Sequence, residues 1–162
     1  MAASTAYDVS LQTVPPRAIA AVRARVPATG VSSAFRTYLD QVHAAGRGGS
    51  VQLDGQNVFV YRDVTDSPNE LDVEFGVGVT APFVGAGNVE YCVAPDGHVA
   101  TTTHWGDYAR LGAAHSALVA WCRSHDVRLA GPRWEVYGHW SADDAAPRTD
   151  IYYLLEPPAT ST

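Results

Sequence analysis

The stretch Pro132-Arg133-Trp134-Glu135-Val136-Tyr137-Gly138 has the pattern of a short aromatic strand that carries one carboxylate. Because successive side chains of a strand point to opposite faces, Glu135 and Tyr137 share one face, and Trp134 and Val136 share the other. An ionised glutamate on a buried face is costly unless it is paired. We therefore expect Glu135 either at a wet sheet edge or in a site that receives a cationic, polar or reactive partner.

The composition limits the classes of protein to which the chain can belong. Its 162 residues, 46% of them hydrophobic and 17% charged, suit one compact domain or two small fused modules. A net charge of -6 argues against direct nucleic-acid binding and favours an uncharged or cationic partner. We expect a cytoplasmic protein with no membrane partner, because the chain contains neither a long apolar run nor a signal-like start. Cys92 and Cys122 are expected to be reduced thiols.

Apolar periodicity and turn residues predict the elements around the opening stretch. Helices are expected over residues 31–46 and, capped by Asp107, over the segment whose apolar stripe runs from Leu111 to Cys122. The other expected strands cover residues 7–26 with a bend at Pro15-Pro16, then 57–64, 71–80, 89–93, 98–105 and 149–155.

The two halves of the chain repeat. Val58–Tyr61 corresponds to Trp134–Tyr137 at an offset of 76 residues, from 58 to 134. We therefore predict one domain over residues 7–156, built from pseudo-repeats 7–80 and 89–156 and followed by a tail over 157–162. The predicted fold is α+β. Two pseudo-twofold strand-helix-strand-strand modules form a curved antiparallel sheet, with both helices on one face and a ligand cleft on the other.

The repeat also predicts what lines the cleft. Its floor would carry Phe59 and Tyr61 from the first half, and Glu135 and Tyr137 from the second. Trp134, which points away from Glu135, is expected in the core under the helices. The register of the last strand is open, so Tyr153 could face either the cleft or the core.

A longer pattern resembles a known family. It comprises Thr103-His104-Trp105-Gly106-Asp107-Tyr108, a helix with Ala114-His115 and Trp121-Cys122, Gly131-Pro132, the Glu135-x-Tyr137 strand and the closing Thr149-Asp150-Ile151-Tyr152. In this order, the pattern is similar to that of the GyrI-like small-molecule-binding family, over about Tyr7 to Glu156. The Gly106-x-Tyr108 turn and the Glu135-x-Tyr137 strand are its most specific parts.

The resemblance implies an aromatic ligand cleft between two modules, with Glu135 at its bottom. The same fold forms effector-binding domains of AraC-type and MerR-type regulators, where that glutamate faces cationic, lipophilic drugs. Some stand-alone members hydrolyse cyclopropane-bearing, DNA-alkylating natural products. Because the first expected strand begins near Tyr7, we expect no DNA-binding helix-turn-helix in this sequence. The ligand-binding residues implied here are Phe59, Tyr61, Trp105, Tyr108, Glu135, Tyr137 and Tyr153.

Three functions are consistent with these residues. The first is sequestration or sensing of a hydrophobic, aromatic or cationic small molecule, for which aromatic rings and a carboxylate suffice. The alternative is hydrolysis of a strained electrophile, with the pKa of Glu135 raised by burial, Glu135 as general acid/base and Tyr137 as its catalytic neighbour. A protein-interaction role is the third. No cofactor is expected, and the six histidines lack metal-ligand spacing.

Overall fold

The structure is a computed structural model that describes residues 7–27, 29–62, 70–85, 87–107, 110–138 and 147–157. These residues form two helices and eight strands, close to the predicted positions, and the α+β class is confirmed. The strands are β1 (Ser10–Val14), β2 (Arg17–Pro27), β3 (Leu53–Arg62), β4 (Glu70–Val79), β5 (Glu90–Ala94), β6 (Gly97–Trp105), β7 (Leu129–Tyr137) and β8 (Arg148–Leu155). The helices are α1 (Val31–Arg47) and α2 (Leu111–Ser124).

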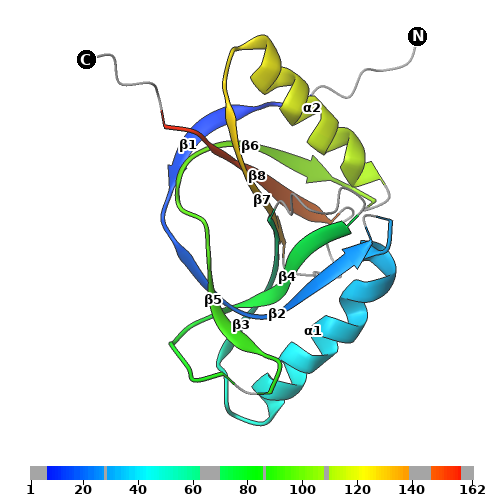
Figure 1. Ribbon diagram of the computed structural model, residues 1–162, viewed down its shortest axis with the longest axis vertical. Coiled ribbons are helices and arrows are strands. Elements are labelled where there is room, and N and C mark those ends of the chain that lie inside the picture. Colours follow the sequence, from blue (N-terminus) through cyan, green and yellow to red (C-terminus); the bar gives the residue numbers. More distant parts are fainter. Residues whose placement is uncertain are drawn as a thin grey trace.

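All eight strands lie in one antiparallel sheet whose order is β1-β6-β8-β7-β3-β4-β2-β5. The order is symmetric about the β7–β3 pair, so that β8 corresponds to β4 and β6 to β2. The edge strands are exchanged between the halves of the chain. β1 pairs with β6 and β5 pairs with β2. The two predicted modules are thus joined into a single curved sheet (Figure 1).

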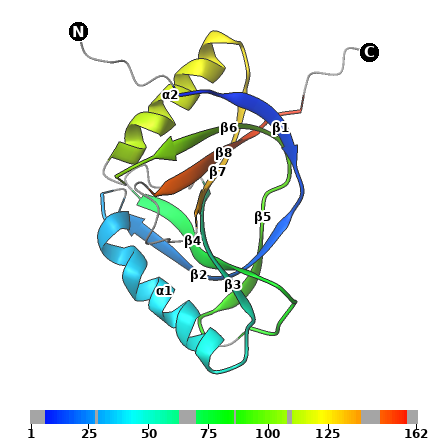
Figure 2. The same ribbon diagram turned by 180° about the vertical axis from the view of Figure 1, so that it is seen from behind.

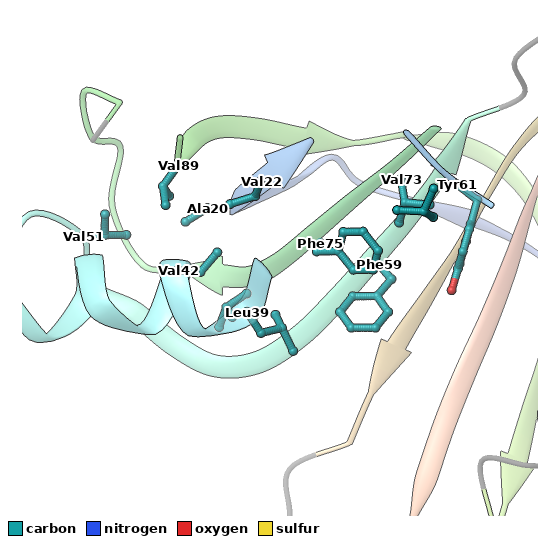
Figure 3. Close-up of a cluster of buried hydrophobic side chains, with 12 residues drawn as sticks. Ala20, Val22, Leu39, Val42, Val51, Phe59, Tyr61, Val73, Phe75 and Val89 are labelled. Carbon is teal, nitrogen blue, oxygen red and sulfur yellow. The ribbon is translucent and has the colours of Figure 1, made fainter. Parts of the chain in front are cut away.

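Both helices cover the same face of the sheet. α1 packs on β2 and β4, and α2 packs on β6. Figures 1 and 2 show the helices on one side of the molecule, while β1 and β5 curve away to the other side. Under α1, Leu39 and Val42 contact a cluster that includes Phe59 and Phe75 (Figure 3). Neither helix is long and apolar enough to cross a membrane.

The opposite face curls onto itself and forms a second core. Its buried members come from five strands and include Ile19, Val58, Val60, Trp134 and Val136. Trp134 is therefore buried as expected, but inside the curl of the sheet and not under the helices. Alternation along the strand separates Trp134 from Glu135, whereas the direction of sheet curvature decides which of the two faces the helices.

The start of α2 also differs from the prediction. The helix begins at Leu111, with Arg110 as its N-cap residue and no side-chain cap. Asp107 contributes its backbone carbonyl, which accepts a hydrogen bond from the Arg110 N–H at 3.0 Å. The helix therefore starts three residues later than a cap at Asp107 requires, and the predicted aspartate cap is wrong.

Candidate functional site

Glu135 lies at the centre of the sheet, on β7, where it pairs with Phe59 of β3 and Ile151 of β8. Its residue is only 4% exposed. The expected placement on the face without helices is corrected by the structure, because Glu135 points to the side that carries α1 and α2. The two helices pack on the outer strands and leave β3 and β7 between them, which makes room for a polar cluster.

Three donors surround the Glu135 carboxylate. The hydroxyls of Tyr61 and Tyr137 each donate to Oε1 at 2.7 Å. Nε2 of His115, on α2, lies 2.7 Å from Oε2. Hydrogen bonds to the ionised form are the usual means by which a buried carboxylate is stabilised. Side chains from β3, β7 and α2 therefore all hydrogen-bond to the same carboxylate.

The network continues through His115 to the last strand. Nδ1 of His115 lies 2.8 Å from the hydroxyl of Tyr153 on β8. An ionised carboxylate can only accept, so a neutral His115 must carry its proton on Nε2 and accept from Tyr153 on Nδ1. Of the two alternatives that the sequence left open for Tyr153, the structure shows the core: it faces the helix side, packs in the cluster under α2 and is linked to Glu135 through His115.

The pKa of Glu135 is lower than its ordinary value of 4.5. Burial raises this pKa, but the hydrogen bond and charge of His115 and the hydrogen bonds from Tyr137 and Tyr61 outweigh it. The expectation of a raised pKa is therefore wrong, and Glu135 is a carboxylate at neutral pH. The pKa of Tyr61 lies well above 10 because of burial, the charge of Glu135 and the hydrogen bond to it.

Phe59 connects the carboxylate cluster to the core under α1. Its ring lies 5.0 Å from the Tyr137 ring and 5.2 Å from the Phe75 ring, both in edge-on geometry. With 5% of its surface exposed, Phe59 forms an apolar wall and is not a groove-floor residue. Beside it, the Arg133 guanidinium lies 5.4 Å from the centre of the Tyr61 ring. Figure 3 shows the Tyr61 hydroxyl pointing away from the aliphatic side chains of this core.

Trp105 is separated from this cluster. It ends β6 with 61% of its surface exposed, and the Arg148 guanidinium lies 5.5 Å from the centre of its ring. Trp105 borders a cavity of about 450 Å³ that also contains Tyr152, which stacks on Trp134 on the inner face of the sheet. Trp105 is thus apart from Glu135, and its role in ligand binding stays a prediction. Tyr108, the other residue implied at this turn, lies outside the described residues.

Glu135 is almost fully shielded from solvent. Four cavities of about 450 to 710 Å³ are lined by described residues, and Glu135 borders none of them. Among its partners, Tyr61 is buried, whereas Tyr137 and His115 are partly exposed; the His115 side chain is 20% exposed against 5% for Glu135. A ligand that reaches the carboxylate must therefore move a side chain, and His115 lies on the outer side.

The prediction did not include His115 in the site. In the sequence it lies four residues after Leu111 and three before Leu118, which places it beside the buried stripe of α2. A histidine at the margin of such a stripe, combined with a glutamate expected to be buried, was the available signal. Pairing them required knowledge of how α2 lies across β7.

The described part of the chain provides no obvious metal site. No group of three or more histidine, cysteine, aspartate or glutamate side chains there is placed to hold a metal ion. His115 is committed to Glu135 and Tyr153, whereas His104 is held by the Tyr7 hydroxyl at 2.9 Å and the Asp107 carbonyl at 2.9 Å. The buried His104 and the partly exposed His115 thus both serve hydrogen-bonded networks.

Comparison with known proteins gives the family. The sequence model of the GyrI-like small molecule binding domain matches residues 7–155, nearly the whole chain. The chain belongs to the GyrI-like family. The predicted family is thereby confirmed, and with it a general capacity to bind a small molecule. A search of curated protein sequences found no match to this GyrI-like chain.

Solved structures share the fold of this GyrI-like chain. The EcmrR C-terminal domain has a TM-score of 0.71 at 24% identity, with 93% of this chain and 98% of that chain covered. EcmrR in a complex with DNA has a TM-score of 0.76 at 24% identity, but the match covers 94% of this chain and only 59% of that chain. SAV2435 bound to tetraphenylphosphonium has a TM-score of 0.62 at 7% identity, with 92% and 94% covered.

Proposed function

We propose that this GyrI-like chain binds a lipophilic, aromatic, cationic small molecule at Glu135, and that it sequesters or senses that molecule. The observation that carries the proposal is an ionised carboxylate, 4% exposed, set among aromatic rings at the centre of the sheet. Such a charge attracts a cation that can leave water without a large penalty, and aromatic faces add about 0.5 to 2 kcal/mol per good cation–π contact.

The relatives support the same class of ligand. SAV2435, which shares the fold, is described as bound to tetraphenylphosphonium, a bulky aromatic cation. In this chain Phe59, Tyr61, Tyr137 and Tyr153 provide the rings nearest the carboxylate. A cation with aromatic or other apolar surface around its charged group would match the ring surface of this site.

The lowered pKa of Glu135 argues against a hydrolytic mechanism in which Glu135 is the general acid. A general acid must hold a proton at the working pH, whereas Glu135 is ionised there. Binding is thus favoured over proton donation to a strained electrophile. From the sequence we also expect a cytoplasmic location. If the protein senses its ligand, we expect a protein partner that receives the signal.

Calorimetry with a panel of cations tests this function. The panel contains tetraphenylphosphonium, planar aromatic dyes and protonated arylalkyl amines, and each is titrated into wild-type protein and Glu135→Gln. We expect Kd to rise about tenfold or more in Glu135→Gln, because the cation loses its buried counter-charge. Glu90→Gln, an exposed position on β5, is the matched control for loss of one negative charge and should bind as the wild type does.

Two results would overturn the proposal. Equal affinities of Glu135→Gln and Glu90→Gln would show that binding, if any, occurs elsewhere on the acidic surface. Mass spectrometry of the ligands after incubation provides the other criterion. Repeated formation of a product one water heavier would make the protein a hydrolase, whereas ligands recovered unchanged support binding.

A further inference from the structure

Oε2 of Glu135 has a different environment from Oε1. Oε1 accepts two tyrosyl hydroxyls, both on strands of the sheet, whereas the hydrogen bond to Oε2 comes from His115 on α2. His115 is also partly exposed, with 20% of its side chain accessible, and it is the member of the network that a helix supplies. Displacing this imidazole is therefore one way for a ligand to reach Oε2 from the helix side of the sheet.

The His115 imidazole resembles the charged group that a cationic ligand would place at this position. It is a planar group that carries an N–H donor 2.7 Å from a buried carboxylate oxygen, and it becomes cationic on protonation. It lies beside an aromatic ring, since its centre is 5.6 Å from the centre of Tyr153. A ligand cation that reaches Oε2 would meet the same oxygen and the same ring.

We propose that His115 occupies the cation subsite of the binding site, so that the imidazole and the ligand compete for Oε2 of Glu135. This inference rests on the function proposed above and specifies its ligand class. Once the imidazole leaves, Oε2 loses its donor, and a buried unpaired carboxylate oxygen is costly. The favoured ligand therefore carries at least one N–H on its charged group, as in a protonated tertiary amine.

Competition makes binding depend on pH through His115. A protonated imidazole forms an ion pair with Glu135 and is harder to displace than a neutral one, so the affinity for a permanently protonated ligand should rise as pH rises. Protonation also reverses the bond to Tyr153, because Nδ1–H then donates to the hydroxyl oxygen. The other titratable groups of the network around His115 are Glu135, Tyr61, Tyr137 and Tyr153, and Arg133 lies over the Tyr61 ring. His104 is on β6, on which α2 packs, and the charged residues at the two ends of α2 are Arg110 and Arg123.

The first experiment uses a matched pair of probes. One is 2-(biphenyl-4-yl)ethyl-dimethylamine, an aliphatic amine that stays protonated up to neutral pH, as lysine does. The other is its N-methylated quaternary form, which differs by a methyl group in place of the N–H. We expect the wild-type protein to bind the amine about tenfold or more tightly, because only the amine restores a donor to Oε2. Equal affinities would overturn the proposed ligand class.

The second experiment removes the competitor. In His115→Ala the amine should bind about tenfold more tightly than in wild type near pH 6, and its Kd should be constant between about pH 5.5 and 7.5. In wild type the Kd should fall across this range. His98→Asn, an exposed β6 position whose ring contacts Thr13, should behave as wild type. Weaker amine binding to His115→Ala would show that His115 supports the ligand and does not compete with it.

The pH series also covers the case in which His115→Ala does not fold, as judged by circular dichroism. In that case the test uses wild type and His98→Asn alone. A Kd for the amine that stays constant or rises as the pH increases would overturn the proposal. Loss of binding only in Glu135→Gln, with no effect of His115→Ala, overturns this inference but leaves the proposed function standing. Absence of Glu135-dependent binding to any probe overturns both.

Discussion

Three hydrogen-bond donors keep the Glu135 carboxylate ionised while it is 4% exposed. The donors outweigh the penalty of burial, which is why the pKa is lowered and not raised. From the sequence, burial alone could be foreseen, and burial alone predicts the wrong direction. The sign of the shift depends on the hydroxyls of Tyr61 and Tyr137 and on a histidine from a distant helix.

The lowered pKa predicts how stability depends on pH. A group whose folded-state pKa lies below its unfolded value adds stability above the unfolded value, near 4.5, and loses it as pH falls through the folded value. Near neutral pH, Glu135→Gln should cost about 1 to 3 kcal/mol in the free energy of unfolding, because one buried donor loses its acceptor.

Urea unfolding of wild type and Glu135→Gln between about pH 3 and pH 7 measures this dependence. The difference between the two proteins should shrink as the solution becomes more acidic than about pH 4.5. A difference that is constant over the whole range would contradict an ionised, hydrogen-bonded Glu135. Glu90→Gln provides the reference for an exposed carboxylate.

At the scale of the elements, the alternation of side chains along a strand gave a correct prediction of which residues share a face. It placed Glu135 with Tyr137 and opposite to Trp134, and the structure agrees. Alternation cannot state which face meets a helix. The inner face is closed by small residues on β2 and β4, where Ala21 pairs with Gly76. Those residues let the sheet curl, and the curl leaves the opposite face to the helices.

Gly76 gives a test of this close packing. A Cβ added there would lie 3.1 Å from the Ala20 carbonyl oxygen, 3.1 Å from the Ala21 Cβ and 2.9 Å from the Ile19 Cδ1. Because backbone atoms are among these neighbours, Gly76→Ala should lower the free energy of unfolding by about 1 to 3 kcal/mol.

The matched control for Gly76→Ala is Gly112→Ala. Gly112 is exposed on α2 and has nothing within 4 Å of the added Cβ, so this change should leave stability equal or raise it by up to about 1 kcal/mol. Chemical denaturation compares the two variants. Equal effects would mean that the contact between β2 and β4 is looser than the structure indicates.

In the whole molecule, the two halves of the chain complete each other. β1 from the first half pairs with β6, β5 from the second half pairs with β2, and β3 pairs with β7 across the centre. The single domain over residues 7–156 with pseudo-repeats 7–80 and 89–156 remains a prediction, in which neither half is expected to fold independently. The exchanged edge strands favour one cooperative unit over two separate ones.

A fragment tests this cooperativity. Residues 7–80 alone would lack β5 and β7, so that β2 and β3 would both have unpaired edges next to an exposed apolar face. We expect the fragment to show no cooperative thermal transition by circular dichroism, while the complete chain does. A sharp transition of the fragment would instead show that the first half is a domain in its own right.

The sequence by itself determined the family, the α+β class, the order of the elements and the pairing of Glu135 with Tyr137 on one face. These follow from local periodicity and from motifs that lie within a few residues of each other. The tertiary structure decided the rest. Glu135 lies on the face of the sheet that carries the helices, His115 bonds to it, and Tyr153 bonds to His115. Trp105 lies apart from this cluster, beside Arg148. Such outcomes depend on sheet curvature and helix placement, which are set by packing between residues far apart in the chain.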